Sequence, residues 1–99
     1  MSQLFNKKDY QILNELIINK CVNSMCSLTI EQLMGLTGFS ATKVRTVVKS
    51  FLILDYIKEG SKDGNCKTYY ITEEGVEHYK VQHGLTDQDI QEMIEEEDI

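Results

Sequence analysis

The chain has 99 residues, is 41% hydrophobic and carries a net charge of −6, which suits one small soluble domain with a modest core. No run reaches the ~20 apolar residues that a membrane span requires, and the first ten residues lack the apolar segment of a signal peptide. We therefore expect a cytoplasmic protein without membrane contact. Three cysteines without CxxC spacing argue against a disulfide framework and a zinc site, so we expect no metal and no cofactor.

Charge is distributed unevenly along the chain. Residues 85–99 carry seven acids and no base, so residues 1–84 alone have a net charge of +1. Six of the ten basic residues fall between Lys43 and Lys67. We expect residues 1–84 to form one domain and residues 85–99 to form an acidic tail or a short helix.

The first helix is expected to begin at Asn6, which pairs with Asp9 in an acidic variant of the capping box. Apolar residues then recur at helical spacing as far as Cys21. Residues 19–27 lose this period and are predicted to form a loop.

A short second helix is predicted after Thr29, because Thr29 and Gln32 form another capping box. Its Leu33 and Leu36 are expected to face the core. Gly38 then supplies the turn, since glycine adopts a left-handed backbone at little cost.

Ser40 is predicted to cap the third helix, which runs from about residue 41 to 54. Its apolar residues share one face, expected to be buried: Val44, Val47, Val48, Phe51, Leu52 and Leu54. The opposite face holds Thr42, Arg45, Thr46, Lys49, Ser50 and Ile53, with Lys43 at its edge. This face has no acid between Thr42 and Ser50, unlike most solvated helix surfaces.

Two strands are predicted next, over residues 55–59 and 67–72, because both segments are rich in β-forming residues. The Asp63-Gly64 pair between them favours a tight hairpin. Thr72 is expected to cap a further helix that ends at Gly84. Thr86 and Asp89 give a last capping signal, followed by a weak apolar stripe in residues 90–94, and residues 95–99 are expected to be frayed.

This order of elements predicts an α+β winged helix-turn-helix with three helices, a β-hairpin wing and a C-terminal helix. In such a domain the second helix of the helix-turn-helix enters the major groove of DNA. Arginine can bond a guanine edge, threonine can contact bases, and lysine can neutralise phosphate. The predicted DNA-binding residues are Ser40, Thr42, Lys43, Arg45, Thr46 and Lys49 on the helix, and Lys62, Asn65 and Lys67 on the hairpin.

Residues 6–83 resemble winged-helix DNA-binding proteins of the MarR/PadR type, through "TIEQLMGLTGFSATKVRTVVKSFLILDYI" and the wing "GSKDGNCKTYYITEEGVE". The junction "SFLILDYIKE" and the wing are similar to those of the TubR family, the centromere-binding proteins of tubulin-type plasmid and phage partition systems. That resemblance implies a homodimer on repeated DNA sites that passes the DNA to a filament-forming, tubulin-like GTPase. It also implies DNA contacts from the third helix and the wing, and Ile53 as a dimer contact.

Two other functions stay open from the sequence. A transcriptional repressor would need the same DNA-binding surface. A protein-interaction winged helix would bind a protein partner through the third helix, and the acidic residues 85–99 could then fold over the basic face or dock a basic partner. No motif for catalysis is present, since the chain lacks a phosphate-binding glycine loop and an HExxH sequence, so we expect no enzyme.

Overall fold

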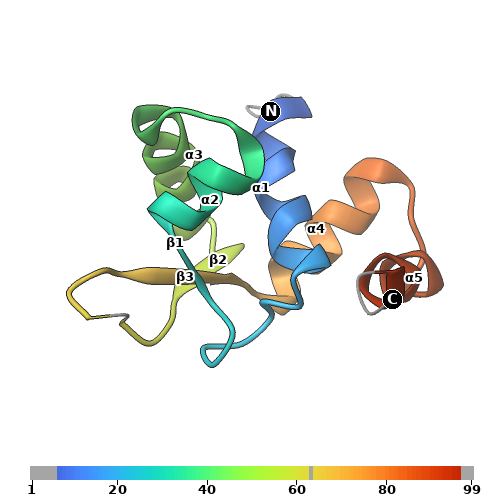
Figure 1. Cartoon of the computed structure of the whole chain (residues 1–99). Coiled ribbons are helices and arrows are strands. Elements are labelled where there is room, and N and C mark those ends of the chain that lie inside the picture. Colours follow the sequence, from blue (N-terminus) through green and yellow to red (C-terminus); the bar gives the residue numbers. More distant parts are fainter. Residues whose placement is uncertain (1–6, 63, 97–99) are drawn as a thin grey trace.

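The computed structural model describes residues 7–62 and 64–96, so the cap expected at Asn6 lies outside the described residues. The elements follow in the order α1 (Lys7–Ile18), β1 (Leu28–Thr29), α2 (Ile30–Thr37), α3 (Ala41–Ile53), β2 (Ile57–Glu59), β3 (Thr68–Ile71), α4 (Glu73–His83) and α5 (Asp87–Glu96). In Figure 1, α1 and α4 lie at the centre, with α2, α3 and the hairpin on one side and α5 on the other. The predicted α+β winged helix-turn-helix is confirmed. None of the described helices is long and apolar enough to cross a membrane.

The strands form one antiparallel sheet in the order β1-β3-β2. The two predicted strands pair as a hairpin, from Ile57↔Ile71 to Glu59↔Tyr69, while Asp63, on which the tight turn was predicted, lies outside the described residues. Strand β1 was not predicted, because its two residues also form the entry to α2. Leu28 pairs with Tyr69, so β1 ties the start of the helix-turn-helix to the hairpin. We call β2, β3 and the segment between them the wing.

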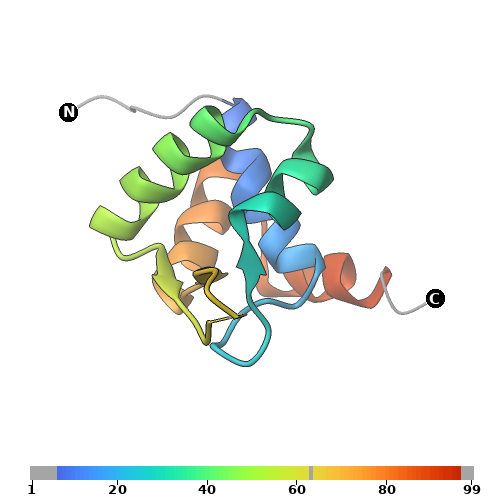
Figure 2. The same ribbon diagram turned by 60° about the vertical axis from the view of Figure 1, so that its left-hand side comes forward.

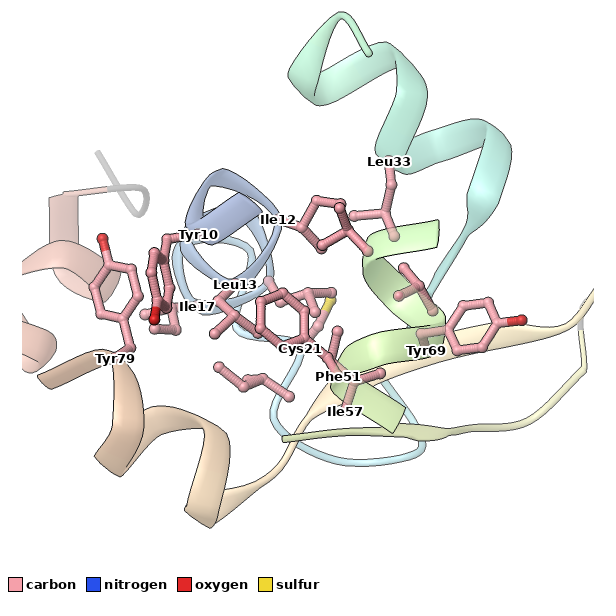
Figure 3. Close-up of a cluster of buried hydrophobic side chains, with 14 of the residues drawn as sticks. Tyr10, Ile12, Leu13, Ile17, Cys21, Leu33, Phe51, Ile57, Tyr69 and Tyr79 are labelled. Carbon is pink, nitrogen blue, oxygen red and sulfur yellow. The ribbon is translucent and has the colours of Figure 1, made fainter. Parts of the chain in front are cut away.

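A single hydrophobic core lies between α1, α3, α4 and the sheet (Figure 3). Phe51 of α3 is fully buried, and its ring packs 6.3 Å from Tyr10 of α1 and 6.2 Å from Tyr56, measured between centroids. The fully buried residues of α1 are Ile12, Leu13, Leu16 and Ile17, as their spacing predicted. The burial of these apolar side chains from both helices holds α3 against α1.

The helix caps predicted at Thr29 and Ser40 are present. Thr29 Oγ1 accepts a hydrogen bond from Gln32 N while Gln32 Oε1 accepts one from Thr29 N, so both halves of the capping box form. Ser40 Oγ accepts from the backbone N of Lys43. Gly38 adopts φ 79°, a left-handed conformation, and turns the chain between α2 and α3.

Two expectations about the core were wrong. Leu36 and Leu54 were predicted to face inward, but both are 44% exposed. The inner stripe of α2 runs through Ile30, Leu33 and Met34, and Leu36 lies outside that i, i+3, i+4 pattern. Leu54 follows the last residue of α3, so helical geometry no longer determines its direction.

The acidic C-terminal segment forms α5, which packs against α1 rather than over α3. Ile90 is buried in the common core, and Met93 and Ile94 pack partly against it. Figures 1 and 2 both show α5 on the side of the domain away from α3. The hypothesis that this segment covers the basic face is therefore wrong for the described residues of α5.

Lys80 of α4 joins α4 to α5. Its ammonium bonds Asp87 in the first turn of α5 and lies 3.1 Å from Glu77 Oε1. The side-chain hydrogen bond to Asp87, followed by that to Glu77, raises the pKa of Lys80 above its ordinary value. The docking of α5 thus combines apolar burial with an ionic link.

The junction between the sheet and α4 is tight. Thr72 Oγ1 donates to the carbonyl of Asp55 at 2.6 Å and accepts from Gly75 N at 3.0 Å, so one hydroxyl caps α4 and secures the turn after α3. A Cβ atom at Gly75 would lie 2.2 Å from the carbonyl oxygen of Tyr56 and 2.7 Å from Cγ1 of Ile71. Only glycine permits this approach.

We predict that Gly75→Ala lowers the free energy of unfolding by about 2 kcal/mol, because the added methyl group meets backbone atoms that have little room to move. Urea denaturation followed by circular dichroism measures the change. Gly35→Ala is the control, since a Cβ there has no neighbour within 4 Å and should stabilise α2 by about 0.5–1 kcal/mol. Equal stability of Gly75→Ala and the parent would contradict the close packing of α4.

Candidate nucleic-acid interface

The outer face of α3, defined by Thr42, Arg45, Thr46 and Lys49, is exposed along its length. It is exposed because Val44, Val47, Val48 and Phe51 on the opposite face are buried. Ser50, predicted on the same outer face, is only half-exposed, and its Oγ donates to the Thr46 carbonyl at 3.2 Å. Sequence periodicity thus predicted the orientation of this helix correctly.

The side chains on this face suit a polyanion whose bases present hydrogen-bond donors and acceptors. Among the described residues, neither Arg45 nor Lys49 is engaged in an ion pair, so both cations remain available to a ligand. The hydroxyl groups of Thr42 and Thr46 stand beside them on the same exposed surface. An arginine fork flanked by hydroxyl groups and a second cation can bond bases and phosphates at once.

Ser40 and Lys43 are positioned differently from the other predicted residues of α3. Ser40 Oγ accepts from the Lys43 backbone N at 3.2 Å, which leaves its hydroxyl proton free to donate outward. Lys43 turns toward α1, where its Nζ lies 2.7 Å from Oδ1 of Asp9. The side chain of Asp9 is only 10% exposed, so Lys43 compensates a nearly buried carboxylate. Sequence spacing could not reveal this long-range pair.

The wing presents the remaining predicted residues, Lys62, Asn65 and Lys67, and all of them are exposed. Lys67 Nζ lies 3.6 Å from Oε2 of Glu59 across the hairpin, which partly neutralises it. Lys62 has no ion-pair partner in the part of the chain that the structure describes. Of the two lysines predicted to bind DNA here, Lys62 is therefore unpaired among the described residues and Lys67 is partly compensated.

A cavity of about 350 Å³ lies between α2, α3 and the wing and brings the two predicted regions together. Arg45 of α3 and Lys67 of the wing both line it. Its other lining residues are Thr29, Ile30, Glu31, Met34, Cys66 and Tyr69. Thr42, Lys49, Lys62 and Asn65 lie outside it, on the exposed surfaces of α3 and the wing.

Sequence reasoning missed two polar residues at this cavity, Glu31 and Tyr69. Glu31 is exposed in the first turn of α2, and its carboxylate can accept from a cytosine amino group. The Tyr69 ring is buried, while Figure 3 shows its hydroxyl group pointing away from the core. Burial along β3 does not alternate, since Thr68, Tyr69 and Ile71 are all buried, so the strand pattern gave no signal for Tyr69.

Within residues 7–62 and 64–96, no group of three or more His, Cys, Asp or Glu side chains is arranged to hold a metal ion. The geometry of the interface is that of a surface for binding, made of cations, hydroxyl groups and a shallow cavity.

Comparison with known proteins identifies close relatives. The DNA-binding protein TubR of a Clostridium botulinum C phage is 43% identical to this chain over 75 residues, which are 76% of this chain and 93% of that protein. The solution structure of the DNA-binding TubR fragment from Clostridium botulinum is 40% identical, with a TM-score of 0.66 over 80% of this chain and 98% of the fragment. No family model matches the chain.

More distant structures share the fold. The crystal structure of MepR, a transcription regulator of the Staphylococcus aureus multidrug efflux pump MepA, has a TM-score of 0.63 over 91% of this chain and 73% of that chain. Its sequence identity is 13%, so this likeness concerns the fold alone.

We predict that Lys43→Ala destabilises the fold by about 1–2 kcal/mol, because it leaves the nearly buried Asp9 carboxylate without its lysine. This loss of stability is smaller than for a fully buried ion pair, because the Lys43 side chain is 34% exposed. Thermal unfolding of the parent and the variant measures the difference. Lys49→Ala, on the same helix but exposed, is the control and should leave stability unchanged within about 0.5 kcal/mol. Equal effects of the two substitutions would contradict the structural role of Lys43.

Proposed function

Because the chain belongs to the TubR family of DNA-binding proteins, we propose that it binds double-stranded DNA sequence-specifically through the outer face of α3 and the wing. The observation that carries this proposal is the convergence of Arg45 and Lys67 on one cavity between α3 and the wing. The overall charge of −6 does not oppose it, because α5, which contains five of the sixteen acids and no base, lies on the far side of the domain.

The outer face of α3 reads bases in this proposal. Arg45 forms the two-pronged hydrogen bond to a guanine edge, while Thr42 and Thr46 contact neighbouring bases. Ser40 and the free backbone N–H groups at the start of α3 bind a phosphate. Lys49 neutralises a further phosphate along the groove, because an ammonium acts there as a point charge.

The wing follows the DNA backbone. Lys67 lines the cavity that α3 borders, and Lys62 and Asn65 are exposed on the same connection, so all three approach the strand next to the groove that α3 occupies. Lys62 contributes the larger electrostatic effect, since Lys67 is partly compensated by Glu59. Such contacts raise affinity for every sequence without distinguishing bases.

We further propose a biological role as a partition adaptor. A homodimer of the chain would bind repeated DNA sites and pass that DNA to a tubulin-like GTPase filament. Sequence similarity to TubR supports this assignment. Transcriptional repression would use the same protein surface, and the two roles differ in the arrangement of their sites. Stepwise loading on repeated sites supports partition, whereas a single palindrome over a promoter supports repression.

We predict that Arg45→Ala weakens binding to the preferred DNA by about 1–3 kcal/mol and relaxes the preference at one base position. Lys62→Ala should weaken binding to preferred and scrambled DNA alike and reduce the slope of log affinity against log salt by about one. Fluorescence anisotropy with DNA flanking the protein's own gene, and with a scrambled duplex, measures both effects at several salt concentrations.

Parallel losses from Arg45→Ala and Lys62→Ala on every duplex would contradict this division between base reading and phosphate binding. Absence of binding by the parent to either duplex, even at low salt, would contradict DNA binding itself. A protein partner for α3 would then be the function to test.

We predict that Ile53→Glu weakens homodimerisation at least tenfold, because a carboxylate would replace an apolar side chain in the proposed dimer contact. Ile53 is 75% exposed at the end of α3. Val81→Glu is the control, since Val81 is 66% exposed on α4 and has no place in the proposed contact. Sedimentation equilibrium of the parent and both variants measures the dimer dissociation constant. An unchanged constant for Ile53→Glu would exclude this contact.

A further inference from the structure

The loop between α1 and β1 brings two cysteine side chains together. Cys21 Sγ and Cys26 Sγ lie 2.8 Å apart, which is less than 1 Å beyond the ~2.05 Å length of a disulfide bond. Cys21 is fully buried beside the core, whereas Cys26 is partly exposed (Figure 3 shows Cys21). Both sulfurs also lie close to the carbonyl oxygen of Asn19, at 3.6 and 3.4 Å. The pair is positioned by the fold, although the sequence spacing gave no sign of it.

The backbone around this pair is already folded into a closed turn. Cys26 N donates to the carbonyl of Asn23 at 3.2 Å, and Met25 N donates to the side-chain oxygen of Asn23 at 2.9 Å. A covalent link between the sulfurs would therefore form within a turn that these hydrogen bonds already close. It would close a short loop that the folded protein has already ordered.

We propose that Cys21 and Cys26 form a modification site at which a low-molecular-weight disulfide generates an intrachain disulfide bond. This inference goes beyond DNA binding and does not depend on it. Cys66 has no such role, because it is exposed on the wing and no other cysteine lies beside it in the described residues.

The reaction proceeds by two thiol–disulfide exchanges. The Cys26 thiolate attacks one sulfur of the reagent RSSR, so a bond forms between Cys26 Sγ and that sulfur while the reagent's S–S bond breaks and releases RS⁻. Cys21 then loses its proton and attacks Cys26 Sγ, which releases the second RS⁻. In total the two protein thiols lose two electrons and two protons, and one RSSR becomes two RSH.

The environments of the two thiols determine which reacts first. Burial, followed by the hydrogen bond with Cys26, raises the pKa of the Cys21 thiol to about 12. A group that stays protonated and buried is a poor nucleophile toward a reagent in solution. Cys26 is the accessible thiol, and the contact between the sulfurs gives Cys21 a high effective concentration for the second step.

The position of the pair connects it to the wing. The carbonyl of Cys21 accepts from Ile71 N in β3 at 2.9 Å, and the carbonyl of Ser24 accepts from Ser61 N at 3.4 Å. Gly60 fits closely beneath the same turn, since a Cβ there would lie 2.2 Å from Ser27 Oγ. A disulfide bond in this turn would therefore stiffen the support at the base of the wing.

The site can be tested by peptide mapping of the full chain carrying Cys66→Ser, so that neither paired cysteine is altered. The folded protein is incubated with oxidised glutathione, alkylated and digested with trypsin. Cys21 and Cys26 lie together in the peptide of residues 21–43, which has no internal Lys or Arg. We expect this peptide to be unalkylated and two hydrogens lighter, and to take up two alkyl groups after reduction.

Two alkylated thiols after oxidation, or a stable mixed disulfide on Cys26, would overturn the proposal. Cys66→Ser combined with Cys26→Ser is the matched control and should give no lighter peptide. A second readout is the thermal midpoint, which we expect to rise by roughly 5 °C or more on oxidation of the Cys66→Ser protein and to return on reduction. A lowered or unchanged midpoint would show that the bond does not fit the native turn.

Discussion

Burial of the inner face of α3 is the constraint on which the interface depends. Val44, Val48 and Phe51 are at most 2% exposed, and burying each such side chain stabilises the fold by about 1.5–3 kcal/mol. An exposed ion pair contributes at most about 1 kcal/mol, so the apolar residues decide how α3 is rotated. Arg45, Thr46 and Lys49 face solvent as a consequence. The packing of α3 thereby determines which of its side chains are available to a ligand.

The wing is held by the same core through two junctions. On one side, the Thr72 hydrogen bond and the close approach at Gly75 pack the start of α4 against the turn that joins α3 to β2. On the other side, the loop containing Cys21 and Ser24 supports β3 and the connection of the hairpin. Helix α3 and the wing therefore keep a defined separation, and the cavity lined by both is part of the folded domain.

Local features could be predicted from the sequence and long-range ones could not. The capping residues Thr29, Ser40 and Thr72 bond groups within their own first turn, so their spacing alone was sufficient. The Asp9–Lys43 pair and the two-residue strand β1 depend on how separate segments meet, and the Cys21–Cys26 contact depends on the path of one irregular loop. The docking of α5 on α1 was missed because its acidic residues suggested a solvated tail, while Ile90 was enough to anchor it.

The central claim is that α3 and the wing together form the DNA-binding surface. Amide hydrogen exchange of the full chain, measured with and without DNA flanking its own gene, tests this most directly. The account predicts added protection in the first half of α3 and in the segment between β2 and β3, with exchange in α5 unchanged. Protection confined to α4 and α5, with none in α3, would contradict it.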